Sequence, residues 1–168
     1  MVEATIAKNE VPINIKERKF QINTEAVPRV IEELNKDDPD RKERIKKLMH
    51  ETGKTPWEMA RYFVREATSI TGTAAALASV EDINPRKAGE LLREICFSEL
   101  DGIAERRARL EAEGRVINLN RIIVLGMAQN LGEGERREIE KMVIEEERQE
   151  LEEKEKEITG ILDEIIRT

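Results

Sequence analysis

Residues 135–166 read ERREIEKMVIEEERQELEEKEKEITGILDEII, and this stretch decides which fold the chain adopts. It contains no proline and a single glycine, and one stripe of it carries an apolar residue at every seventh position. The four residues of that stripe are Ile144, Leu151, Ile158 and Ile165. The positions three residues later are Glu147, Lys154, Ile161 and Thr168, so the second heptad stripe is mostly polar. The pattern predicts one long helix of roughly 45 to 50 Å, and it does not establish a coiled coil.

Apolar residues cluster at both ends of this helix, in residues 139–144 and 158–166. Charged runs flank Leu151 between the clusters, so we expect the middle of the helix to face solvent. A helix of this length reaches beyond what one small domain can cover. We therefore expect one end to dock on the chain's own body and the other on a partner, most simply a second copy. The residues expected at this oligomer contact are Ile144, Leu151, Ile158, Ile161, Leu162 and Ile165.

The segment before it, residues 116–131, is apolar on nearly all sides. Its large apolar residues include Ile117, Leu119, Ile122, Ile123, Val124, Leu125 and Met127. A helix without a polar face must be surrounded by other parts of the protein, so we expect a buried central helix here. Polar residues such as Asn118, Arg121 and Gln129 interrupt the segment, and it cannot supply the roughly 20 apolar residues that a membrane span requires.

Helix signals also recur through the first two thirds of the chain. Thr24 predicts a helix through about residue 36, and a second helix is expected over 41–51, ending at Gly53. Thr55 followed by Pro56 predicts the start of a third helix, whose aromatic residues should build the N-terminal core. Small residues predict a short, closely packed helix over 71–80. A long helix is expected from Pro85 to Gly114.

Strand signals are confined to the opening of the chain. Apolar residues alternate on either side of residues 16–19, which predicts a hairpin with Ile13, Ile15, Phe20 and Ile22 on one face. Residues 4–7 are a candidate for a third short strand. The predicted fold class is mainly α, a multi-helix bundle with a small N-terminal β-hairpin and a long C-terminal helix. We expect a small α+β head over residues 1–70 and a helical bundle over residues 71–168.

Composition limits the setting in which the protein works. Charged residues make up 39% of the 168 positions and glutamine is scarce, a balance associated with ion-pair networks in proteins from thermophiles. A single cysteine excludes an internal disulfide and no signal segment opens the chain, so a cytoplasmic protein is expected. Residues 1–70 hold 14 Lys or Arg and 13 Asp or Glu, so the net charge of −7 lies in the remainder. A polyanionic partner would therefore meet the first part.

The residues typical of catalysis do not form a recognisable centre. His50, the only histidine, has Lys46 and Lys47 as helical neighbours, and we interpret it as a surface residue near a helix end. Cys96 lies between apolar residues and is interpreted as buried and inert. Glu147 and Glu150 have the spacing of a helical metal site, but their charged surroundings favour a solvated face. We predict no catalytic residue, metal ligand or cofactor, although Glu94, Glu99 and Asp101 remain an acidic group for a metal or nucleotide alternative.

The stretch RIKKLMHETGKTPWEMAR, residues 44–61, resembles the helix, glycine turn and helix of small DNA-binding modules of the helix-turn-helix and ribbon-helix-helix types. It covers about a tenth of the chain. The resemblance implies DNA binding through the segment 41–65. The basic residues that would carry it are Lys42, Arg44, Lys46, Lys47 and Lys54. The main functional prediction is a non-enzymatic helical assembly protein that forms a homo-oligomer through its C-terminal helices, and a DNA-binding regulator or packaging-type protein is the alternative.

Overall fold

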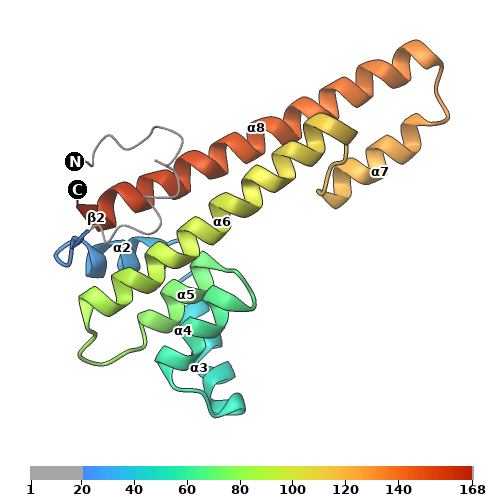
Figure 1. The fold of residues 1–168 in the computed structure, drawn as a ribbon. Coiled ribbons are helices and arrows are strands. Elements are labelled where there is room, and N and C mark those ends of the chain that lie inside the picture. Colours follow the sequence, from blue (N-terminus) through green and yellow to red (C-terminus); the bar gives the residue numbers. More distant parts are fainter. Residues whose placement is uncertain (1–20, 168) are drawn as a thin grey trace, which may run out of the picture. The chain divides into compact units, whose positions relative to one another are not determined.

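The computed structural model describes residues 21–167, with Arg167 described by its backbone. The described residues are mainly helical, which confirms the predicted fold class (Figure 1). The elements are β1 (Gln21–Ile22), α2 (Val27–Leu34), α3 (Arg41–Thr52), α4 (Pro56–Arg65), α5 (Ile70–Leu77), α6 (Pro85–Glu113), α7 (Leu119–Ala128), α8 (Glu133–Ile165) and β2 (Ile166–Arg167). The long C-terminal helix is α8. No helix within residues 21–167 has both the length and the apolar composition needed to cross a membrane.

The short strand β1 pairs with a strand from the far end of the chain. Gln21 lies opposite Arg167 and Ile22 opposite Ile166 in an antiparallel ladder, and the Asn23 N–H donates to the Ile165 carbonyl at 2.8 Å. The remainder of the expected hairpin, like residues 4–7, lies outside the described residues. Behind the strand, a side chain at Gly89 would collide with Ile22, so glycine allows β1 to lie directly on α6.

The chain divides into two compact units. The described part of the first comprises residues 21–99 and 160–167, and the second comprises residues 100–159. Both boundaries fall inside helices, within α6 and within α8. The boundary predicted at residue 70 lies inside the first unit.

Helix α5 is the centre of the first unit. Residues 72–77 of this helix are all buried, and α2, α3 and α4 each contact it. The small side chains permit this, and a Cβ at Gly72 would lie 2.5 Å from the Phe63 ring. Helix α4 buries Met59, Ala60 and Val64, whereas Tyr62 is exposed. Of the aromatic residues expected to build this core, Phe63 packs on α5 and Tyr62 is exposed, so aliphatic and small residues around α5 make up most of it.

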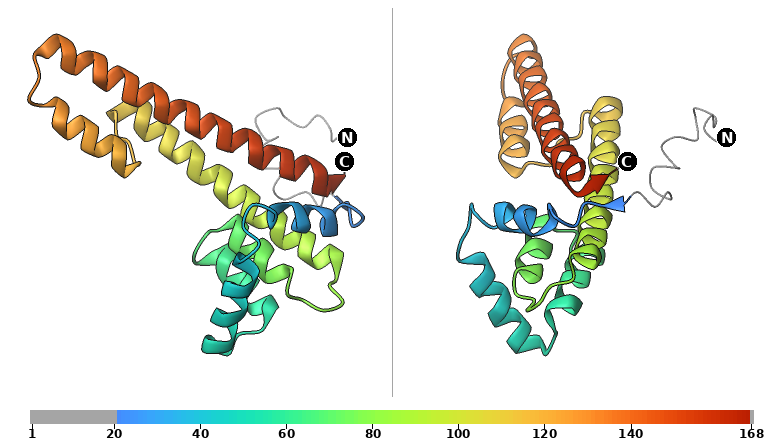
Figure 2. Two further views of the ribbon diagram at one scale, coloured as in Figure 1. Left: turned by 180° about the vertical axis from the view of Figure 1, so that it is seen from behind. Right: turned by 90° about the vertical axis from the view of Figure 1, so that its left-hand side faces the viewer.

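The second unit joins three helical segments, the last part of α6, all of α7 and most of α8 (Figure 2). Arg107 on α6 pairs with Glu155 on α8 at 3.0 Å, and Arg148 on α8 pairs with Glu111 on α6 at 2.6 Å. Its buried apolar residues are Ile103, Leu110, Ala128, Val143, Leu151 and Ile158.

Candidate interaction surface

Large apolar side chains are exposed on α7 and on the residues around it. Eight of the nine exposed large apolar residues of the described chain lie between positions 117 and 142. We call them the α7 surface: Ile117, Leu119, Ile122, Ile123, Val124, Met127, Leu131 and Met142. Leu119 and Met127 are 69% and 67% exposed, and only Ala128 of α7 is buried. The prediction of a surrounded central helix is therefore wrong for the single chain, because α7 has protein on one side only.

The start of α7 is fixed by Asn118. Its side-chain oxygen accepts hydrogen bonds from the N–H groups of Asn120 and Arg121, at 2.9 and 3.3 Å. This N-cap satisfies two of the donors that a helix leaves unpaired at its first turn. Because the capping residue has an extended backbone, the helix begins at Leu119 and not at Val116 as the apolar pattern predicted.

Arg121 fastens α7 to α8. Its guanidinium donates to Glu147 at 2.5 Å and to Glu150 at 2.7 Å, and Glu146 lies 3.8 Å away. Glu147 is 5% exposed and also accepts the Ile117 N–H at 3.2 Å. Burial acts to lower the pKa of Arg121, but the hydrogen bonds and charges of Glu147 and Glu150 raise it above its usual value. The guanidinium therefore stays charged where the two helices meet.

This attachment sets which side of α7 faces outward. Arg121 and Ala128 are seven residues apart and lie on the side turned to α8. Leu119, Ile122, Ile123 and Met127 lie on the opposite side. Arg121 is also the only charged residue between positions 116 and 132, and α8 supplies its counter-charges. The outward face is therefore apolar and uncharged.

Most of the six residues predicted at the oligomer contact are already covered within the single chain. Leu151, Ile158, Leu162 and Ile165 are buried, and Ile144 and Ile161 are half-buried, so most of this set belongs to the interior of the single chain. The expectation that the middle of α8 faces solvent is wrong at Leu151 and Glu147, which are 3% and 5% exposed. Glu147 pairs with Arg121 and is not part of a solvated face.

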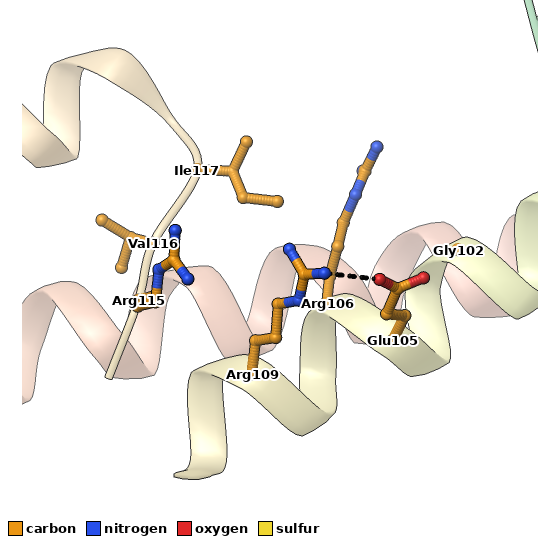
Figure 3. Close-up of a pocket in the computed structure, with 7 residues that line it drawn as sticks. All are labelled: Gly102, Glu105, Arg106, Arg109, Arg115, Val116 and Ile117. Atoms are coloured by element: carbon orange, nitrogen blue, oxygen red, sulfur yellow. Dashed lines mark hydrogen bonds and ion pairs between the residues drawn. The ribbon is translucent and has the colours of Figure 1, made fainter. Parts of the chain in front are cut away.

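A hollow of about 310 Å³ lies in the second unit between the end of α6 and the segment before α7 (Figure 3). Arg106, Arg109 and Arg115 line it together with Val116 and Ile117. Guanidinium groups suit carboxylate or phosphate ligands. Here Glu105 already pairs with Arg109 at 2.7 Å, and Glu113 pairs with Arg115 at 3.4 Å. The hollow therefore has mixed charge, and its apolar wall is continuous with the α7 surface through Ile117.

The helix–turn–helix predicted over residues 41–65 is confirmed as local structure. Helix α3 ends at Gly53, whose φ of +70° suits glycine, and Thr55 caps α4. The Thr55 N–H donates to the Glu58 carboxylate at 2.9 Å, and the Thr55 hydroxyl accepts the Glu58 N–H at 3.2 Å. These hydrogen bonds lower the pKa of Glu58.

The basic residues of this segment lie at its surface. Arg44, Lys46, Lys47 and Lys54 are exposed, and Lys42 is half-buried. Arg44 pairs with Asp38 and lowers the pKa of that carboxyl, while Lys46 lies 3.6 Å from Glu43. The ammonium of Lys54 stands 5.9 Å from the centre of the Tyr62 ring. Part of the positive charge is therefore offset by neighbouring carboxylates.

The remaining candidates are the residues considered for catalysis or metal binding. His50 is exposed in the last turn of α3. Cys96 is fully buried, and burial, together with the charge of Glu99, raises its pKa to about 12. Glu94 lies 3.8 Å from Arg65. Within residues 21–167, no three His, Cys, Asp or Glu side chains are grouped so that they could hold a metal ion.

Comparison of the chain with models of known protein families, with characterised proteins and with solved structures finds no match.

Proposed function

We propose that the protein is a non-enzymatic assembly protein that forms a homo-oligomer through its C-terminal helices, with the α7 surface as the contact. The observation that carries the proposal is the concentration of exposed large apolar side chains at this one place. Contiguous apolar patches on soluble proteins mark interaction sites. An all-round apolar helix with protein on one side only indicates that something else covers the other side.

The energetics favour covering this surface. Full burial of one Leu, Ile or Met side chain stabilises by about 1.5–3 kcal/mol. Association of two proteins costs about 4–15 kcal/mol in lost freedom of motion. Several such side chains on each of two copies therefore supply free energy of the size needed, even though each is partly shielded already.

A second copy fits this surface better than a membrane does. The chain carries a net charge of −7, so two copies repel each other over most of their surfaces. The α7 surface has no net charge facing outward, and it can meet its own counterpart without like charges coming together. By contrast, a helix that lies in a membrane surface carries Lys or Arg on its polar face, whereas the one basic residue of α7, Arg121, is paired with carboxylates of α8.

The test is the mass of the protein in solution, measured by light scattering over a series of micromolar concentrations. We expect at least twice the chain mass for the native protein and the monomer mass for Ile123→Glu, which places a charge in the middle of the α7 surface. Tyr62→Glu is the matched control, because Tyr62 is an exposed large apolar residue outside this surface, and this variant should keep the native mass. A native chain that stays monomeric throughout, or that instead binds lipid vesicles as a monomer, overturns the proposal.

DNA binding through residues 41–65 is the second candidate. It is supported by the two consecutive helices α3 and α4, joined by a short turn at Gly53, and by the exposed basic residues on α3 and the turn. Retention of a labelled DNA duplex should then weaken steeply as salt is raised, because phosphate contacts release counterions. Lys47→Ala should reduce retention, whereas Lys156→Ala on the acidic helix α8 should not. Lack of retention even at low salt removes this candidate.

A further inference from the structure

The outward face of α7 has the spacing by which one helix packs against another. Leu119, Ile122, Ile123, Gly126 and Met127 follow the order i, i+3, i+4, i+7 and i+8, so all five share one side of the helix. Four of them expose large side chains, and the fifth is a glycine in their midst. The face is therefore an apolar stripe with a notch at Gly126, where the helix backbone itself is exposed.

No contact among residues 21–167 requires a glycine at this notch. A Cβ built on Gly126 meets no atom within 4 Å, and its φ lies outside the left-handed region. Glycine is also the least favourable residue inside a helix apart from proline. An alanine would therefore fit the single chain and stabilise α7, so packing within the described residues does not account for the glycine.

Open space alone does not single out Gly126, because Gly160 on α8 also has no atom within 4 Å of a built Cβ. The surroundings differ, however. The helical neighbours of Gly160 at three and four positions include Glu157, Asp163 and Glu164, which are exposed and charged. The neighbours of Gly126 on the same criterion include Ile122 and Ile123, which are exposed and apolar. Unlike Gly160, Gly126 therefore exposes helix backbone between large apolar side chains.

We propose that two copies of the chain pair by laying α7 against α7, and that the two helices cross at Gly126. This inference rests on the proposed self-association and names its contact. Helices pack by fitting the side-chain ridges of one into the grooves of the other, and their axes come closest where the side chains at the crossing are smallest. In a twofold dimer each surface meets an identical surface, so a residue at the axis meets its own counterpart. Gly126 then faces Gly126 of the second copy, with Ile122 and Ile123 packed beside the crossing.

The first test compares two glycine-to-alanine variants by sedimentation equilibrium. Gly126→Ala inserts a methyl group at the proposed crossing and should weaken self-association by about tenfold or more, because overpacking a close contact forces the helices apart. Gly160→Ala makes the same change in a charged stretch of α8 and should leave self-association within about twofold of the native value. Alanine favours helix in both variants, so neither change endangers folding.

The second test uses disulfide cross-linking. Gly126→Cys should give a covalently linked dimer under mild oxidation, because a disulfide requires Cα atoms within about 7 Å of each other. Gly160→Cys is the control and should remain uncrosslinked. The native Cys96 does not compete, since its thiol is fully buried. Both products are read by non-reducing electrophoresis of the full chain.

The outcomes separate this inference from the proposal on which it rests. If the native chain self-associates but Gly126→Ala associates as tightly and Gly126→Cys forms no linked dimer, the helices do not cross at Gly126, while self-association stands. If the native chain is monomeric, the proposed self-association and the proposed crossing at Gly126 are both overturned. A weakened Gly126→Ala together with a linked Gly126→Cys supports the crossing.

Discussion

Arg121 determines which side of α7 faces α8 and which side faces outward. Its guanidinium reaches three carboxylates of α8, and Glu147 in turn receives the Ile117 N–H, so a single cluster holds both the helix and the segment leading into it. A buried ion pair adds little net stability over an apolar pair, because both charges must leave water. Removing one partner is costly, however, and the geometry of the pair is specific. The cluster therefore fixes orientation more than it adds stability.

We predict that Arg121→Ala lowers the free energy of unfolding by about 1–3 kcal/mol, because it leaves the carboxylate of Glu147 buried without its partner. Urea denaturation followed by circular dichroism measures this change. Arg137→Ala is the control, since Arg137 pairs with Glu133 at the surface, where water and salt screen the charges. Equal stability of the two variants would contradict the structural role given to Arg121.

Single residues were predictable from the sequence where their role is local. Thr55 caps α4 and Gly53 ends α3 as predicted, because both roles depend only on neighbours in the chain. The exposed His50 and the buried Cys96 also agree with their interpretations. The pairing of Arg121 with Glu147 was missed, since a partner 26 positions away is chosen by tertiary packing. One signal pointed to it: Arg121 is the only charge in an otherwise uncharged stretch, and such a charge requires a counter-charge.

At the scale of elements, capping residues located the starts of α4 and α6, whereas Thr24 does not cap α2, which begins at Val27 after Ala26. Asn84 caps α6 at its predicted start, through hydrogen bonds from the N–H groups of Arg86 and Lys87. Helix α6 continues through Gly89 and Gly102 to residue 113, as its periodicity predicted. The apolar content of residues 116–131 predicted a longer, surrounded helix. That prediction fails for the single chain because apolar content indicates a need for burial without identifying what supplies it.

The glycines inside helices divide into two kinds, and their alanine variants should change stability in opposite directions. Gly160→Ala should raise the free energy of unfolding by about 0.5–1 kcal/mol, because the site is open and alanine favours helix. Gly72→Ala should lower it, because the added methyl group would lie 2.5 Å from the Phe63 ring at the α4–α5 contact. Thermal unfolding checks both variants. A Gly72→Ala protein as stable as the native one would show that this packing is looser than described.

For the whole molecule, the sequence predicted the class of fold but not which segments come together. Helix periodicity and caps are local signals, and they suffice to show a mainly helical chain. The joining of β1 to β2, and of residues 160–167 to the unit that contains α2 to α5, depends on contacts between distant positions. No periodic pattern encodes such contacts. The first compact unit therefore combines residues 21–99 with residues 160–167, a combination that no local pattern predicts.

Self-association through the α7 surface predicts a particular response to salt. Raising NaCl from about 0.1 M to about 1 M shortens the Debye length from about 10 to about 3 Å, which weakens the repulsion between copies of charge −7. The proposed contact is uncharged on its outward face, so salt screening removes no favourable ion pair from it. The dissociation constant from sedimentation should therefore stay constant or fall with salt. A dissociation constant that rises would indicate that ion pairs, and not the α7 surface, hold the copies together.

The seam between β1 and β2 imposes an order on folding. The side chain of Asn23 donates to the Glu164 carbonyl across 141 positions of chain, and closing so long a loop costs conformational entropy before the contact is made. Helices α2 to α5 meet partners that lie close in sequence and can assemble earlier. We therefore expect the pairing of β1 with β2 to form after helices α2 to α5 have assembled, which hydrogen exchange during refolding would show as late protection of the Asn23 N–H.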